Sequence, residues 1–290
     1  MIRIHRWFWL AMLVAAATAR GGDLTFTVMA ANLSGDDTLY RRPAGRIFRG
    51  LKPDIVVLQE WNVLDGDYRK FVGRHFGRGF SFCVQRSRRK GMPNGIVSRW
   101  PITARGLWKD PVVDDRGFVW ATIDLPGPRD LHAVSVHFKH GGNSKEKQKR
   151  RGEAELLVDY IRRAGWPADD YLVIAGDLNS INLKEPLFTV LSSVVGNARQ
   201  PADQSGAIGT SVSRKKCYDH VLANPALEAC QVPVEIEGLV FSNGMVFDSR
   251  RWTPPPPPIL PDDSVQAGMQ HLAVMKAFRI PVPDAAEPLP

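Results

Sequence analysis

Six apolar segments of this chain each begin or end with a polar side chain that could take part in chemistry. The segment YLVIAGDLNS places Asp177 and Asn179 directly after an apolar run, and residues i and i+2 of a strand point the same way. The other five segments carry Asn32, Glu60, His137, Asp219 and His271. Each residue alone could cap a turn, form a surface ion pair or lie in the core. Six similar cases together favour one polar pocket, because polar strand ends are costly unless they bind something charged.

These residue types suit hydrolysis at phosphorus. Glu60 and Asn32 offer the hard oxygen ligands that Mg²⁺ prefers, so we predict them at a metal site. Asp177 can orient and deprotonate a water molecule, and Asn179 can hold that water. The set therefore predicts in-line attack of water on a phosphoester.

Imidazole groups complete the predicted site. His271 could donate to a phosphate oxygen if Asp219 holds its other nitrogen, and His137 could make a second such contact. Arg116 has two interpretations, a phosphate contact or an ordinary surface arginine. His220 follows Asp219 in the same strand, so its side chain should face away from the pocket and be structural.

The elements that would position these side chains are mostly strands. Continuous apolar runs rich in Val, Ile, Phe and Trp predict strands at 24–32, 54–61, 80–85, 95–100, 117–125, 131–138, 171–179, 219–223, 232–241 and 271–280. Helical spacing predicts helices over 42–54, over 144–165 with Ser144 as N-cap, and over 185–195. Such strands are covered on both faces, which predicts two packed sheets with helices on the outer faces.

With these residues and strands, the sequence resembles the endonuclease/exonuclease/phosphatase superfamily, which has the deoxyribonuclease I-like fold. The matching segments are DIVVLQEW, NGIVSRWPI, VSVHF, VIAGDLNS, YDHVLA and QHLAV, spread from about residue 24 to residue 280. The resemblance implies a four-layer α/β/β/α sandwich, two packed mixed sheets with helices outside. It also implies an Mg²⁺-dependent phosphodiesterase or phosphatase, with Mn²⁺ as the alternative metal. It places Asn32 and Glu60 at the metal, Asp177 and Asn179 at the water.

One position departs from the family pattern. The family usually has Ser-Asp-His before its last strand, whereas this chain has Met269-Gln270-His271. Gln270 keeps an acceptor oxygen but lacks the negative charge of aspartate. The electric field that acts on the metal or on His271 should therefore be weaker. Glu60, Asp177 and Asp219 still supply three carboxylates.

The first residues have the pattern of an export signal. MIRIHR carries two arginines, the apolar run 7–19 follows, and Ala17-Thr18-Ala19 is a small-x-small cleavage site. We therefore predict a signal peptide at 1–19, a catalytic domain at 20–282 and a disordered tail at 283–290, in a secreted or periplasmic protein. Removing 1–19 lowers the net charge from +8 to +6, with 36 basic and 30 acidic side chains left.

A positive charge is compatible with polyanionic substrates, and a nuclease is the first hypothesis. A basic stretch after His137 could follow a phosphate backbone or could be a solvated helix start: Lys139, His140, Lys145, Lys147, Lys149, Arg150 and Arg151. The alternatives are a phosphatase or a sphingomyelinase-like lipid phosphodiesterase at a membrane, although no apolar hairpin stands out. A non-catalytic polyanion-binding module is the third hypothesis. No obligate protein partner is inferred.

Two further features leave alternatives open. In an oxidising compartment Cys217 and Cys230 could form a disulfide, or all three cysteines, with Cys83, could be buried free thiols. Five prolines, 254–258, predict a stiff surface loop in the polyproline II conformation.

Overall fold

The computed structural model describes residues 22–34, 37–63, 66–85, 92–113, 115–266 and 269–283, with 37–41 described by their backbone alone. The predicted signal peptide, 1–19, and all but the first residue of the predicted tail lie outside these ranges. Within them, no helix combines the length and the apolar composition that crossing a membrane requires.

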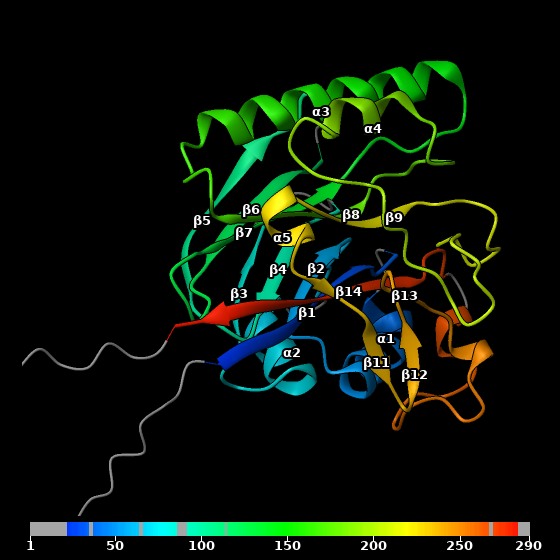
Figure 1. Ribbon diagram of the computed structural model, residues 1–290. Coiled ribbons are helices and arrows are strands. Elements are labelled where there is room, and N and C mark those ends of the chain that lie inside the picture. Colours follow the sequence, from blue (N-terminus) through cyan, green and yellow to red (C-terminus); the bar gives the residue numbers. More distant parts are fainter. Residues whose placement is uncertain are drawn as a thin grey trace, which may run out of the picture.

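Two β-sheets form the centre of the fold (Figure 1). The first sheet has the strand order β10-β14-β1-β2-β4-β3, and β13 also pairs with β14. Its strands are β1 (Gly22–Asn32), β2 (Ile55–Gln59), β3 (Ser81–Val84), β4 (Gly95–Ser98), β10 (Gln231–Val232), β13 (Met245–Phe247) and β14 (Ala273–Val282). Because β1 and β2 are parallel while β1 and β14 are antiparallel, this sheet is mixed.

The second sheet has the order β5-β6-β7-β8-β9. Its strands are β5 (Ile102–Lys109), β6 (Gly117–Ile123), β7 (Leu131–His137), β8 (Tyr171–Asp177) and β9 (Asp219–Ala223). The pair β7 and β8 is parallel, and the other neighbouring pairs are antiparallel.

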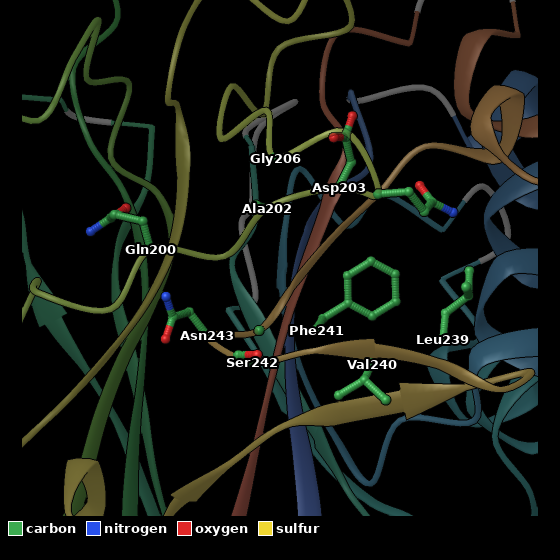
Figure 2. A pocket seen from close by; sticks show the side chains of 11 residues that line it. Gln200, Ala202, Asp203, Gly206, Leu239, Val240, Phe241, Ser242 and Asn243 are labelled. Carbon is green, nitrogen blue, oxygen red and sulfur yellow. The ribbon is translucent and has the colours of Figure 1, made fainter.

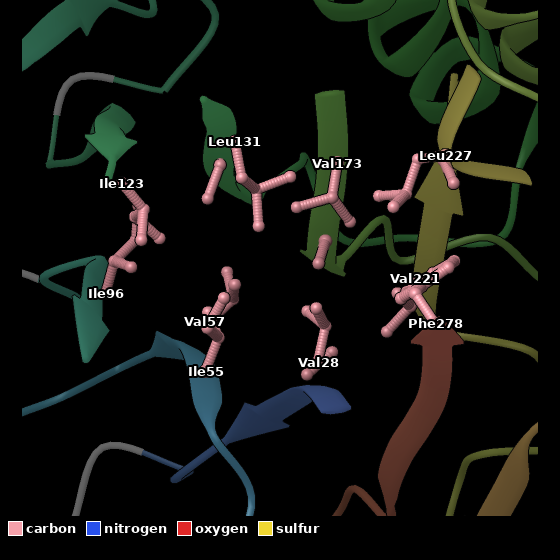
Figure 3. Packing of buried hydrophobic residues seen from close by; sticks show 14 of the residues in the cluster. Val28, Ile55, Val57, Ile96, Ile123, Leu131, Val173, Val221, Leu227 and Phe278 are labelled. Carbon is pink, nitrogen blue, oxygen red and sulfur yellow. The ribbon is translucent and has the colours of Figure 1, made fainter. Parts of the chain in front are cut away.

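Alternating side chains from the two sheets fill the space between them (Figure 3). In β2, Ile55 and Val57 face the other sheet, whereas Val56 and Leu58 face outward into a separate cluster. This period of two makes both faces of each central strand apolar, and it explains the continuous hydrophobic runs in the sequence.

Helices cover the two outer faces. Helices α1 (Asp37–Leu51) and α2 (Tyr68–His75) pack on the first sheet, and α3 (Ser144–Arg163) and α4 (Pro186–Leu191) pack on the second. The short helix α5 (Pro225–Glu228) follows β9, and the 3₁₀ helices η1 (Ser249–Arg251) and η2 (Asp263–Val265) flank the proline segment. The predicted four-layer α/β/β/α sandwich is confirmed.

Several element predictions were wrong in detail. The segment 232–241 is not one strand, because Glu237 and Gly238 both have positive φ and turn the chain between β11 (Val234–Ile236) and β12 (Leu239–Phe241). Strands β5 and β13 and helix α2 were not predicted. Helix α3 is capped by Asn143, whose side chain accepts from the Glu146 backbone N–H, and not by Ser144.

The three cysteines are free thiols, so the predicted Cys217–Cys230 disulfide is not formed. Cys217 precedes β9 and Cys230 follows α5, which places the five-residue strand, roughly 16 Å long, between them. Cys83 and Cys217 are buried, and Cys230 is partly exposed.

Candidate active site

The strand ends that carry the predicted residues meet at one edge of the sandwich. Asn32 is the last residue of β1 and pairs in register with Gln59, so Glu60 follows directly beside it. In the second sheet Asp177 pairs with His137 on one side and with Asp219 on the other. Parallel neighbours end at the same edge, and this brings the two sets of side chains together.

Asp177 lies at the centre of this group. Its Oδ2 accepts hydrogen bonds from the amide groups of Asn32 (3.0 Å) and Asn179 (3.1 Å). The Nε2 atoms of His137 and His271 lie 3.3 and 3.7 Å from the same oxygen. Asp177 is buried, and burial raises its pKa to about 7 against the opposing charge of His271. A carboxylate with this pKa can accept a proton near neutral pH.

The backbone around Asp177 depends on two unusual positions. Gly176 has φ +133°, and a Cβ there would lie 2.3 Å from the Val136 carbonyl oxygen, so this position requires glycine. Asn179 has φ 50°, a conformation that asparagine tolerates better than most residues. Its backbone N–H donates to Asp177 Oδ1 at 2.7 Å, which closes the turn and fixes the carboxylate.

Arg116 determines which nitrogen of His137 carries the proton. Arg116 Nη1 donates to His137 Nδ1 at 3.3 Å, and a guanidinium can only donate, so Nδ1 is the acceptor. The ring proton is therefore on Nε2, which faces Asp177 and also lies 3.7 Å from Glu60 Oε1. Burial, and then the charge of Arg116, holds the pKa of His137 well below its usual value. His137 is thus a neutral hydrogen-bond donor.

His271 has the opposite electrostatic environment. Its Nδ1 lies 3.0 Å from Asp219 Oδ2, and Nε2 faces Asp177. Burial lowers its pKa, but Asp219 and Asp177 outweigh burial and raise the pKa to about 9. His271 is therefore an imidazolium at neutral pH, held by a carboxylate as the sequence predicted.

The donor set fits a hard divalent cation. Side-chain atoms of Asp177, Asp219 and His271 lie within 4.8 Å of one another, and with His271 in its charged form the carboxylates are the ligands of this group. Asp219 Oδ1 is buried and has no hydrogen-bond partner in the part of the chain that the structure describes, although buried polar atoms normally have one. Glu60, with 15% of its side chain exposed, adds a third carboxylate. Asn32 turns its oxygen to the Ser34 backbone N–H and its amide nitrogen to Glu60 and Asp177, so its role as a metal ligand stays a prediction.

The loops that follow β7 and β8 are tied together by a buried ion pair. Arg150 donates to both carboxylate oxygens of Glu185 at 2.7–2.9 Å. It also donates to the carbonyl oxygens of Lys139 and Gly141, and Glu185 accepts from the Ile181 backbone N–H. Arg150 belongs to the stretch that could have contacted phosphate, but it is fully buried and structural.

The rest of that basic stretch is partly neutralised. Lys149 pairs with Glu146 at 3.2 Å, and Arg151 pairs with Glu155 at 2.9 Å. Within the described ranges, no such ion pair is formed by the exposed or half-exposed lysines Lys139, Lys145 and Lys147.

Gln270 and His220 lie outside the group of contacting side chains. Gln270 is exposed, and its backbone carbonyl accepts from Val212. His220 faces away from the site as predicted, and its Nε2 contacts Ser180 Oγ (2.9 Å) and the Cys217 carbonyl oxygen (2.8 Å). It therefore joins the start of β9 to the turn after Asn179.

Sequence reasoning missed a second layer around His271. Thr210 Oγ1 accepts from the Asp219 backbone N–H at 2.9 Å, and Ser211 forms an isolated β-bridge with His271. The ring of Tyr218 packs on His271 at 5.4 Å between centroids, and Lys216 Nζ lies 5.3 Å from the Tyr218 ring centroid. The sequence signal was only that Tyr218 precedes Asp219.

A buried carboxyl group behind the site predicts a pH effect on stability. Glu153 accepts the Lys139 backbone N–H, and burial with the charge of Asp110 raises its pKa from 4.5 to about 9. The folded state thus binds this proton more tightly, so the unfolding free energy should fall as pH rises from 4.5 to 9. Glu153→Gln keeps the acceptor but cannot ionise, and it should flatten this slope in urea titrations at pH 5, 7 and 8.5. The exposed neighbour Glu155→Gln should leave the slope unchanged, and an unaltered slope in Glu153→Gln would contradict the assignment.

Known proteins resemble this chain in sequence and in fold. A family model described as the Endonuclease/Exonuclease/phosphatase family matches residues 29–256. Sphingomyelinase C from Bacillus cereus is 27% identical over 95 residues, which span 29% of this chain and 28% of that protein. The match thus covers well under a third of the curated relative.

Solved structures match over most of the chain. Truncated TDP2 from Caenorhabditis elegans has a TM-score of 0.62 at 14% identity, with 88% of this chain and 97% of that chain covered. Sphingomyelinase C from Streptomyces griseocarneus has a TM-score of 0.57 at 16% identity, covering 88% and 99%. At these identities the likeness establishes the fold.

Proposed function

The chain belongs to the endonuclease/exonuclease/phosphatase family, and from this premise we propose that it is an exported, metal-dependent phosphodiesterase that cleaves nucleic acid. The observation that carries the proposal is the position of Asp177 between two imidazoles in opposite protonation states. A site of this kind pairs a base for water with two donors for a phosphate.

Each side chain has a distinct role in the proposed reaction. Asp177, with a pKa of about 7, takes the proton from the attacking water, and Asn179 keeps the carboxylate in place. His137 donates from Nε2 and His271 from Nε2, so both stabilise charge on the phosphate oxygens in the transition state. Asp219 holds His271 in its charged form.

A divalent cation, Mg²⁺ or Mn²⁺, would supply charge neutralisation at the phosphate and the leaving oxygen. Glu60 and Asp219 are the carboxylates that would hold it, and Asn32 orients Glu60.

The charges near the site favour a polyanionic substrate. Lys139 lies two residues after His137 at the end of β7, and Lys216 lies beside Tyr218, whose ring packs on His271. A strand of nucleic acid presents phosphates on both sides of the scissile bond, and cations in these places would contact them.

A lipid phosphodiesterase is the second candidate, because the β11–β12 hairpin exposes apolar side chains. Leu239 and Val240 are 40% and 62% exposed, although the sequence had indicated no apolar hairpin. A groove of about 380 Å³ separates this hairpin from the segment 200–206, and Figure 2 shows Phe241 between the two walls. Such a hairpin could enter a lipid surface. The partial match to Bacillus cereus sphingomyelinase C also favours this candidate.

A substrate panel distinguishes the two candidates. The mature protein is incubated with Mg²⁺ or Mn²⁺ and with plasmid DNA, RNA, sphingomyelin or bis-p-nitrophenyl phosphate. Degradation of nucleic acid is the expected result, and release of choline phosphate alone would instead establish the lipid activity. EDTA should abolish hydrolysis, and added Mg²⁺ or Mn²⁺ should restore it. Full activity after exhaustive chelation would overturn the metal requirement.

A control variant tests whether the lipid candidate depends on the hairpin. Val240→Ser removes the most exposed of its apolar side chains without touching the site. It should leave hydrolysis of nucleic acid unchanged. A selective loss of activity on sphingomyelin vesicles would support the second candidate.

A further inference from the structure

A continuous series of contacts crosses the site from one cation to another. Lys216 lies over the Tyr218 ring, the Tyr218 ring packs on His271, and His271 faces Asp177. On the other side of Asp177, His137 leads to Arg116. The scissile phosphate would lie beside His137 and His271. Lys216 is at one end of this series of contacts and Arg116 is at the other.

The backbone of Lys216 is hydrogen-bonded to the segment that lies beside His271. Its carbonyl oxygen accepts from the backbone N–H groups of Thr210 (2.8 Å) and Ser211 (3.0 Å), and its own N–H donates to Ser211 Oγ. Ser211 in turn forms a β-bridge with His271. Among the described residues no carboxylate lies within ion-pairing distance of Lys216, so its ammonium group is available to a ligand.

Lys216 and Tyr218 together could distinguish a nucleic acid from a phosphocholine lipid. Both side chains are partly exposed. An aromatic ring accepts a nucleobase or a sugar by stacking, and an unpaired ammonium group attracts a phosphate. The same ammonium group would repel the trimethylammonium group of a phosphocholine head group.

We propose that Lys216 and Tyr218 form a subsite for the nucleotide next to the scissile phosphate, with Lys216 contacting the flanking phosphate. This inference rests on the proposed nuclease activity and names the determinant of its substrate class. It predicts that a second negative charge on the substrate contributes to catalysis through Lys216.

A trinucleotide with two phosphates tests the subsite directly. Cleavage of dT-p-dT-p-dT is compared with two analogues in which one or the other linkage is an uncharged methylphosphonate. In each analogue only the remaining phosphodiester can be cleaved. The natural protein should prefer the dianionic trinucleotide over the analogue whose uncharged linkage lies on the side of Lys216, by about fivefold to tenfold in kcat/KM, as expected for a charge-assisted contact. Lys216→Gln should lose that preference. Its kcat/KM on bis-p-nitrophenyl phosphate, which has one phosphate, should stay within about twofold.

The controls separate this inference from the proposed function. Lys215→Gln removes an exposed neighbouring cation and should retain the preference. If the natural protein cleaves no nucleic acid, the proposed function fails. If it cleaves the trinucleotide but Lys216→Gln retains the preference, or loses activity equally on bis-p-nitrophenyl phosphate, the subsite is wrong.

Discussion

Asp177→Asn is expected to lower the kcat for phosphodiester hydrolysis by about 10²- to 10⁴-fold, the usual contribution of a positioned general base. An amide cannot take a proton from water. Its nitrogen would also face donor groups of Asn32 and Asn179, which now share Asp177 Oδ2 as their acceptor. The measurement is steady-state hydrolysis of bis-p-nitrophenyl phosphate and of an oligonucleotide, with thermal unfolding recorded for the same samples.

Asp170→Asn is the matched control for Asp177→Asn. Asp170 contacts His132 at 2.9 Å, so it is also a carboxylate beside a histidine, but it precedes β8 and lies at the opposite end of that strand. This variant should keep normal kcat. An Asp177→Asn variant that kept more than about a tenth of the natural activity would remove Asp177 from the role of base.

Arg150→Met is expected to cause the largest loss of stability, about 3–5 kcal/mol of unfolding free energy. The substitution leaves the Glu185 carboxylate buried without its partner, and it leaves the carbonyl oxygens of Lys139 and Gly141 without a donor. Because these loops follow the strands that carry His137 and Asp177, activity should fall as well. Urea unfolding measured by tryptophan fluorescence gives the free energy.

Two further variants test the explanation for Arg150. Arg151→Met breaks an exposed pair with Glu155 and should cost less than about 1 kcal/mol. The double variant Arg150→Met/Glu185→Met removes both buried charges and should recover much of the lost stability. A double variant no more stable than Arg150→Met would indicate that the contacts to the carbonyl oxygens, rather than the unpaired carboxylate, cause the loss.

The layers of the fold could be predicted because local sequence carries their signal. Runs such as the one in β8 are apolar on both faces, and the spacing of Leu157 and Ile161 in α3 is helical. The hairpin of β11 and β12 was missed because an apolar run hides a turn whose only marker is Glu237-Gly238. Turns of this kind depend on backbone conformations that composition does not reveal.

For the candidate site, the sequence by itself determined which side chains stand at the strand ends, because a strand of period two delivers Asp177 and Asn179 to one side. Only the tertiary structure decided their states. Burial and then the charge of Arg116 keep His137 a neutral donor, and Asp219 keeps His271 charged, although both are buried histidines at strand ends. The same holds for Arg150, which looked like part of a basic surface and is buried. Charge, tautomer and burial depend on neighbours distant along the chain, and those neighbours are set by how the two sheets pack.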